Sequence, residues 1–222
     1  MTRESIPRRS VLLTAGGLVA GGAGGAGAAL ALSGSAKPAA RAAGLPPWLK
    51  DEAQPAPNED LMSEHGLLIR ILLIYRHLLT EHAAGKPILA SQPRDAALVI
   101  HDYIEAFHEE LEEAYVFPRL VAAGLQKETV STLLLQHARG REQTQLILAS
   151  TASAGTLPPA RAERVAGAMA AFVRMYEPHE AREDTVIYPA FRSLLTPAQV
   201  AELGERFAQL QREQFGPAAL AS

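Results

Sequence analysis

One pattern occurs twice in this chain, as FHEELEEAYVFPRL at residues 107–120 and as PHEAREDTVIYPAF at residues 178–191. In each copy, a His is followed directly by Glu, by a second Glu four positions after the His, and by an aromatic–proline pair at the ninth and tenth positions. Residues four apart lie on the same face of an α-helix. Each copy therefore predicts a helix that presents an imidazole beside a carboxylate, from His108 with Glu112 and from His179 with Glu183.

The repeat extends to the helices that precede these two segments. His65, in SEHGLL, and His137, in LQHARG, are 72 residues apart, and His108 and His179 are 71 residues apart. Two similar helical hairpins are therefore predicted, each with one His on its first helix and a His–Glu pair on its second. Internal pseudo-symmetry of this kind brings equivalent residues around a common axis.

Composition and periodicity favour an all-α protein. Hydrophobic residues make up 48% of the 222 residues and aromatic residues only 5%, while Ala, Leu, Glu, Gln and Arg are strong helix formers. The short connections predict an up-down-up-down four-helix bundle with a shorter fifth helix that begins at Thr196–Pro197. The long helices are expected at about 59–84, with Asn58 as N-cap, and at about 94–123, 126–152 and 159–194.

Four histidines and two glutamates in an apolar bundle core require compensation, because buried polar groups without partners are costly. A pair of divalent cations compensates directly, since neutral imidazoles bind metal and glutamates can bridge two ions. The chain has no Cys, so thiolate ligands are excluded. The His–Glu spacing alone is weak support, because His77 with Glu81 and His101 with Glu105 also show it.

From about residue 59 to residue 194, the chain resembles the hemerythrin-like domains, the HHE cation-binding family. The resemblance rests on His65, HEELEEAYVFP, His137 and PHEAREDTVIYP. It implies a four-helix bundle around a non-haem di-iron centre, with Glu112 and Glu183 as bridging carboxylates and Glu109 as an additional ligand. The full ligand set that the resemblance implies is His65, His108, Glu109, Glu112, His137, His179 and Glu183.

The third helix departs from the oxygen-carrying members of that family, which have two histidines spaced by four there. In this chain Arg141 lies four residues after His137, and Leu133 lies four residues before it. One imidazole is therefore missing, which weakens the expectation of reversible oxygen carriage. The freed coordination position could hold water, Glu109 or a reacting ligand.

Other metal sites and partners fit the sequence less well. A ferritin-like di-iron bundle needs Glu-x-x-His on two helices; Glu105 and His108 supply this once, but Tyr176 stands at the equivalent place before His179. Zinc accepts His and carboxylate ligands, yet bridging carboxylates suit iron or manganese better, and two iron ions are the expected cofactor. The net charge of −3 and the lack of a basic stripe argue against nucleic-acid binding.

The first 42 residues are typical of a twin-arginine export signal. Arg8 and Arg9 precede an uncharged stretch from Val11 to Leu32, after which small residues follow. The predicted location is periplasmic or extracytoplasmic, reached through the twin-arginine export machinery, with a membrane anchor as the alternative if the signal stays uncleaved. The predicted divisions are a signal peptide at 1–42, a linker at 43–58, the metal-binding bundle at 59–195, and a C-terminal helix and tail at 196–222.

The expected function is that of a non-haem di-iron protein that binds dioxygen or a related small ligand, for sensing, scavenging or storage. The alternative is a di-iron enzyme acting on peroxide, dioxygen or nitric oxide, because an open coordination position permits such chemistry. No acid–base pair outside the metal shell identifies a substrate, so no catalytic residue is assigned. A third hypothesis is a structural protein with a degenerate site, and the oligomeric state is left open.

Overall fold

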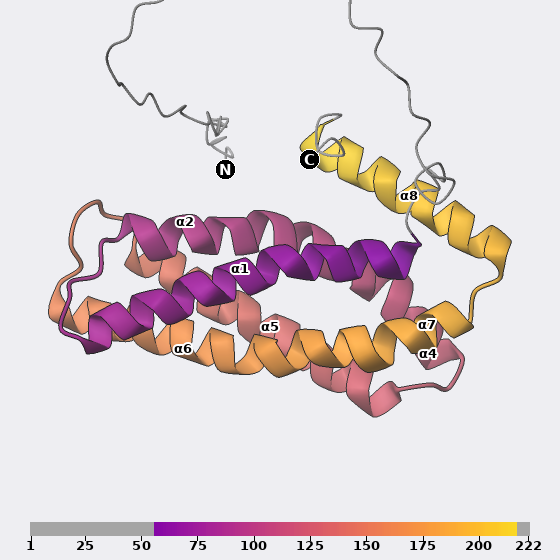
Figure 1. Ribbon diagram of the computed structural model, residues 1–222, viewed down its shortest axis with the longest axis horizontal. Helices are drawn as coiled ribbons and strands as arrows, with labels where there is room; N and C mark the ends of the chain where they lie inside the picture. Colours follow the sequence, from indigo (N-terminus) through magenta and orange to yellow (C-terminus); the bar gives the residue numbers. More distant parts are fainter. Residues whose placement is uncertain (1–55, 217–222) are drawn as a thin grey trace, which may run out of the picture. The chain divides into compact units, whose positions relative to one another are not determined.

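The computed structural model describes residues 56–216, which fold as a helical bundle (Figure 1). Among these residues there is no strand, and one isolated bridge joins Leu89 to Thr156. The predicted all-α four-helix bundle with an extra C-terminal helix is confirmed. The elements are α1 (Pro57–Ala83), α2 (Ser91–Val99), η2 (Ile100–His108), α3 (Glu109–Leu111), η3 (Glu112–Val116), α4 (Phe117–Ala122), α5 (Lys127–Ser150), α6 (Pro159–Arg182), η4 (Glu183–Ile187), α7 (Tyr188–Ser193) and α8 (Pro197–Phe215).

Four long helices form the bundle, and two of them contain wider turns. The second helix runs without a break through α2, η2, α3, η3 and α4, and the fourth runs through α6, η4 and α7. The helix α6 packs against both α1 and α5, and Figure 1 shows α1 and α6 side by side. No helix within residues 56–216 has both the length and the apolar character needed to span a membrane. The predicted signal at 1–42 lies outside the described residues.

The helix ends follow ordinary capping rules, with one correction. The first helix begins at Pro57 with Ala56 as its N-cap, so the expectation that Asn58 caps it is wrong. Proline suits the first position because its missing N–H has no intrahelical partner there. At the start of α8, Thr196 is the N-cap as expected: its hydroxyl accepts from the Gln199 amide, and the Gln199 side chain accepts from the Thr196 amide. Such a capping box stabilises a helix by about 1 kcal/mol.

The aromatic–proline pair of each repeat closes a π turn, in which hydrogen bonds span five residues instead of four. The Phe117 amide donates to the Glu112 carbonyl, and the Tyr188 amide donates to the Glu183 carbonyl. A proline in a regular α-helix clashes with the carbonyl four residues earlier. The wider turn just before Pro118 relieves this clash and lets the helix continue to Ala122. Glu112 and Glu183 each occupy the first position of such a turn, a feature often found at functional sites.

Two apolar clusters form the core, one on each side of a polar layer. The first includes Leu68, Ile104 and Met169, and the second includes Leu61 and Leu133. His65 lies between Leu61 and Leu68 along α1, so the polar layer divides the core between the clusters.

The last helix, α8, lies against the bundle and adds apolar contacts to its second cluster. Phe207 packs edge-on against Tyr115, and Phe215 packs against Tyr103 and Phe107. The helix α8 therefore packs against α1 and against the second long helix.

Candidate metal centre

The polar layer consists of side chains from all four bundle helices. Each is buried, with no more than 2% of its surface exposed. An uncompensated group of this kind would strongly destabilise the fold. The layer contains all seven predicted ligands: His65, His108, Glu109, Glu112, His137, His179 and Glu183.

The Nε2 atoms of the imidazoles face the two predicted bridging carboxylates. Nε2 of His179 lies 3.2 Å from Glu183 Oε1, and Nε2 of His65 lies 3.4 Å from Glu183 Oε2. Nε2 of His137 lies 3.5 Å from Glu112 Oε2, and Nε2 of His108 lies 3.8 Å from the same oxygen. The imidazoles therefore converge on Glu112 and Glu183.

The second hairpin forms the tightest cluster of candidate ligand atoms. One atom each from His137, His179 and Glu183 lie within 4.8 Å of one another. The Nε2 atoms of His137 and His179 are 3.2 Å apart. Two nitrogens bound to one cation at about 2.1 Å each are separated by a similar distance. This cluster therefore has the composition and spacing of a cation site.

The first helix of each hairpin carries a histidine whose Nδ1 atom lies beside an acid, and the two acids occupy equivalent positions in the repeat. Nδ1 of His65 lies 2.8 Å from Asp184 Oδ1, and Nδ1 of His137 lies 2.9 Å from Glu113 Oε1. Asp184 and Glu113 are the residues that directly follow the two predicted bridging glutamates. A carboxylate that accepts from Nδ1–H fixes the ring and leaves the Nε2 lone pair for a metal.

The histidines of the two second helices are held in the same way. Nδ1 of His108 lies 2.8 Å from Glu64 Oε2, and Nδ1 of His179 lies 3.0 Å from Gln136 Oε1. Glu64 and Gln136 directly precede the first-helix histidines. All four imidazoles therefore have an acceptor at Nδ1, and the four acceptors obey the same pseudo-symmetry as the ligands.

The aromatic residues of the repeat also cross between the hairpins. The Tyr188 ring stacks on His65, with centroids 5.6 Å apart, and the Phe117 ring lies 5.7 Å from that of His137. The Tyr188 hydroxyl donates to Glu112 Oε1 over 2.8 Å. The aromatic residues of both aromatic–proline pairs therefore lie against the predicted ligands.

Glu109 is placed differently from the two predicted bridging glutamates. Its Oε1 accepts a 2.6 Å hydrogen bond from Tyr176, and its Oε2 forms a 2.8 Å ion pair with Arg141 that lacks hydrogen-bond geometry. Its nearest imidazole atom is Nδ1 of His137, at 3.9 Å. Arg141 also contacts Glu113 at 2.8 Å, so it joins two acids that border His137.

Charge is unevenly shared between the two central carboxyl groups. Burial and the neighbouring Glu183 raise the pKa of Glu112 well above its usual value. Burial opposes ionisation of Glu183 too, but His179 and His65 hold its pKa below the usual range. Both oxygens of Glu183 and Oε2 of Glu112 have no hydrogen-bond partner. Oxygens that are buried and unpaired beside imidazole nitrogens fit a bound cation, because a cation would pair with both atom types.

The remaining histidines lie outside this layer. His77 is exposed. His101 is partly exposed, and its Nδ1 lies 2.8 Å from Asp102 Oδ1. His82 pairs with Glu163 at 3.1 Å.

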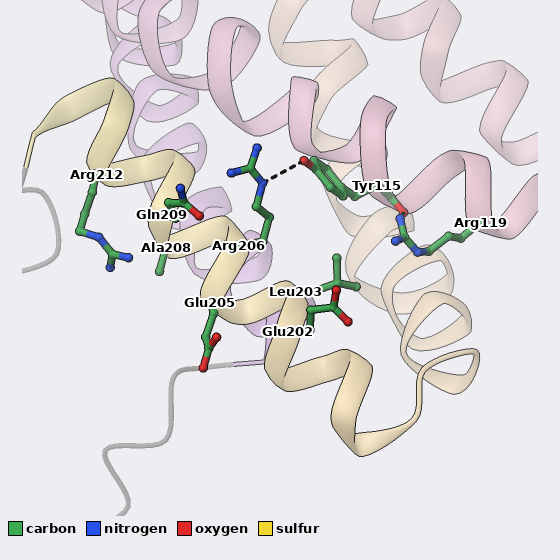
Figure 2. Close-up of a pocket in the computed structure, with 9 residues that line it drawn as sticks. All are labelled: Tyr115, Arg119, Glu202, Leu203, Glu205, Arg206, Ala208, Gln209 and Arg212. Atoms are coloured by element: carbon green, nitrogen blue, oxygen red, sulfur yellow. Dashed lines mark hydrogen bonds between the residues drawn. The ribbon is translucent and has the colours of Figure 1, made fainter.

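A hollow of about 740 Å³ lies away from the polar layer, between α8 and the residues around Tyr115 (Figure 2). Figure 2 shows Arg206 and Tyr115 pointing toward one another, joined by a 3.4 Å hydrogen bond. None of its lining residues is a predicted ligand, and no His lines it. Its size alone therefore does not make it a rival to the polar layer.

Sequence reasoning missed the residues that support the ligands. A signal for them exists in the repeat: an acid follows the second Glu in both copies, as Glu113 and Asp184, and an oxygen-bearing side chain precedes each first-helix His. Tyr176 has no such signal, because the equivalent position in the first copy is Glu105.

Comparison with known proteins supports a cation-binding domain. The uncharacterized proteins Rv1995 of Mycobacterium tuberculosis and Mb2018 of Mycobacterium bovis are each 42% identical to this chain over 164 residues. These residues are 74% of this chain, and the chain spans 64% of the length of these curated relatives. No solved structure matches the chain. Residues 128–214, which include His137, His179 and Glu183, match the family described as Hemerythrin HHE cation binding domain.

Proposed function

We propose that this protein is a non-haem di-iron protein of hemerythrin type. The observation that carries the proposal is the arrangement of four buried imidazoles, each with Nδ1 beside an acceptor and Nε2 toward Glu112 or Glu183. Three of the four oxygens of these two carboxylates have no hydrogen-bond partner. The residues that would hold the ions are His65, His108, Glu112, His137, His179 and Glu183. The family match reaches only the second hairpin, so the first hairpin enters through the repeat and its equivalent contacts.

Two ions account for the site better than one. Each hairpin contributes two imidazoles and one glutamate, and the Nε2 atoms of both hairpins approach both glutamates. Glu112 and Glu183 would therefore bridge the pair. Carboxylate and imidazole ligands with bridging geometry suit iron, with manganese and zinc as weaker alternatives.

Glu109 enters this account as a supporting residue that can become a ligand. Tyr176 and Arg141 engage its two oxygens, so it would first have to leave Arg141. Its position beside His137 makes it the nearest extra carboxylate to the second-hairpin cluster.

The bound iron pair would supply reversible redox chemistry and coordination positions for a small ligand, which we take to be dioxygen or a related molecule. In place of the second third-helix imidazole of oxygen-carrying hemerythrins, this chain has Arg141, which pairs with Glu109 and Glu113. Six protein ligands for two ions leave room for such a ligand. Sensing, scavenging and storage all fit this site.

The second candidate is an enzyme acting on peroxide, dioxygen or nitric oxide. Two phenols favour it, because Tyr188 donates to Glu112 and Tyr176 donates to Glu109. Phenols in these positions can supply protons near the ions, which a simple binding protein does not need.

The experiment that separates these candidates begins with anaerobic loading of the protein with ferrous iron. Exposure to dioxygen, followed by its removal, should change the optical spectrum and then restore it if the protein is a carrier or sensor. Multiple turnovers of hydrogen peroxide or nitric oxide, lost in Tyr188→Phe with iron content unchanged, would instead favour the enzyme. No spectral response to any of these molecules in the iron-loaded protein would contradict both.

We also propose that the protein is exported through the twin-arginine machinery, because Arg8 and Arg9 precede a long uncharged stretch. Replacing both arginines by lysine should retain the protein in the cytoplasmic fraction. Unchanged fractionation of that variant would contradict export by this route.

A further inference from the structure

A surface hollow lies beside the polar layer, between the second and third long helices. It has a volume of about 260 Å³. Its wall includes Arg141, whose guanidinium contacts Glu109 within the layer. The lining residues are His101, Glu105, Ala106, Glu110, Arg141 and Gln145.

Buried polar groups without partners are found at one lining residue of this hollow, Glu105, and at Thr144 close to it. Glu105 is only 6% exposed, and its Oε1 has no hydrogen-bond partner. The Thr144 hydroxyl, one helical turn from Arg141, is fully buried and also unpaired. Burial raises the pKa of Glu105, and the nearby Thr144 hydroxyl opposes this rise. The two groups are therefore close, although they form no hydrogen bond with each other. Unpaired buried groups at the edge of a hollow are where small polar molecules are held.

A third unpaired group lies deeper, within the first apolar cluster. The Tyr75 hydroxyl is completely buried and has no partner within the described part of the chain. Burial, followed by the Glu105 carboxyl, raises the pKa of Tyr75, which places the two groups within electrostatic reach.

Arg141 stands between the hollow and the predicted ligands. Its side chain is 34% exposed, yet its Nη2 atom lies 2.8 Å from both Glu109 Oε2 and Glu113 Oε1. The carboxyl group of Glu109 is buried, so Arg141 supplies the charge that compensates it, and the guanidinium lies between the hollow and the polar layer. A movement of Arg141 toward solvent would bring the hollow into contact with Glu109.

We propose that the hollow lined by Glu105, Arg141 and Gln145 is the access route by which small polar molecules reach the metal centre, with Arg141 as its gate. The route rests on the di-iron function proposed above. The unpaired Glu105 and Thr144 groups would hold a molecule that forms hydrogen bonds on its way inward. Glu109 would receive it at the inner end, beside His137.

The access route is tested by measuring the association rate, the dissociation rate and the Kd of azide with the oxidised, iron-loaded protein. Gln145→Trp places a bulky ring at the exposed mouth of the hollow, away from every predicted ligand. The association and dissociation rates should both fall at least about fivefold while Kd stays within about twofold, because a barrier on a path slows both directions equally. Gln92→Trp, at the exposed edge of a different hollow, is the matched control and should leave both rates unchanged.

Arg141→Ala provides the opposite change. Removing the gate should raise the azide association rate at least about threefold, whereas Arg139→Ala, which removes an exposed ion pair on the same helix, should not. Wild-type rates in both Gln145→Trp and Arg141→Ala would overturn the access route. Failure of the wild-type chain to retain iron would overturn the metal centre itself, and the route with it, before any rate is measured.

Discussion

At the scale of single residues, the two hairpins have the same contacts but not the same chemistry. Tyr188 donates to Glu112, while Phe117, its equivalent, has no hydroxyl to offer Glu183. Glu64 holds His108 with a carboxylate, whereas Gln136 holds His179 with a neutral amide. The two cation positions should therefore differ in affinity and in redox potential.

The acid behind His65 should matter for cation affinity. Asp184→Asn keeps the size of the side chain but removes the charge that fixes Nδ1 of His65 at 2.8 Å. Loss of such a supporting partner typically weakens metal affinity about 10–100-fold, and competition with a coloured chelator measures this. Asp102→Asn is the matched control, because Asp102 holds the exposed His101 at the same distance. Equal affinities for the two variants would contradict the role given to Asp184.

The position of Tyr176 depends on the absence of a side chain at residue 140. A Cβ added to Gly140 would collide with the Tyr176 ring and hydroxyl, whereas a Cβ on Gly167, also within a helix, meets nothing. Gly140→Ala should therefore lower the free energy of unfolding by about 1–3 kcal/mol. Gly167→Ala should raise it by about 0.5–1 kcal/mol. Chemical denaturation of both variants checks the signs, and a stabilised Gly140→Ala would refute this packing.

Protonation of His65 predicts how the metal-free protein responds to pH. Burial lowers its pKa, but the hydrogen bond to Asp184 and the nearby Glu183 outweigh burial and raise the pKa from 6.5 to about 9. The stabilisation is therefore complete below the unfolded pKa and disappears as the pH rises through about 9. The raised pKa values of Glu180 (about 7), Glu112 and His137 act in the same direction between pH 7 and pH 9, so the contribution of His65 is the part that a His65 variant removes.

Across that window, the free energy of unfolding of the metal-free protein should fall by roughly 2–3 kcal/mol. Cation affinity should rise over the same range, because only the neutral imidazole binds metal. Urea unfolding at the two pH values gives the first quantity, and His65→Asn should flatten the dependence. A metal-free protein that becomes more stable from pH 7 to pH 9 would contradict the assignment.

At the scale of elements, the π turns set the register of the site. A helix turns about 100° per residue, so one additional residue in a turn changes which side chains share a face. Glu112 begins one such turn and Phe117 ends it, which lets both approach the polar layer despite Pro118. The same arrangement recurs from Glu183 to Tyr188.

Deleting the exposed residue Ala114 would convert the first π turn into an ordinary α turn. The ring of Pro118 would then meet a helix carbonyl, which costs about 3 kcal/mol, and Phe117 would rotate away from His137. We expect both lower stability and weaker cation binding, measured by thermal melting with and without iron. Deletion of Ala152, in the loop after α5, is the control, and equal losses from the two deletions would argue against the π turn as the cause.

Much of the element pattern was predictable from local sequence. Four helices and the capped start at Thr196 followed from periodicity and turn residues, and the repeat brought His65, His108, His137 and His179 into one layer. The π turns were not predicted, because the aromatic–proline pair has the same local sequence at a helix end and at a wide turn. The supports of the imidazoles were also missed, because contacts such as His65 with Asp184 join residues on helices far apart in sequence.

At the scale of the whole molecule, the polar layer separates two apolar clusters that would otherwise form one core. Without cations, this layer leaves buried carboxylate oxygens unpaired and raises the pKa of Glu112 through its neighbour Glu183. With cations, all four helices would be tied together at the middle of the bundle. A ligand that binds only the folded state stabilises it by mass action, so iron should raise the melting temperature of the whole bundle.

The measurement that tests the central claim most directly is the iron content of the protein after anaerobic loading and removal of excess iron. We predict about two irons per chain, since two imidazole–glutamate sets are present, and a content near zero in the double variant Glu112→Gln/Glu183→Gln. His82→Ala, which alters a histidine outside the polar layer, should retain the wild-type content. A wild-type chain without iron, or a double variant with undiminished iron, would contradict the account.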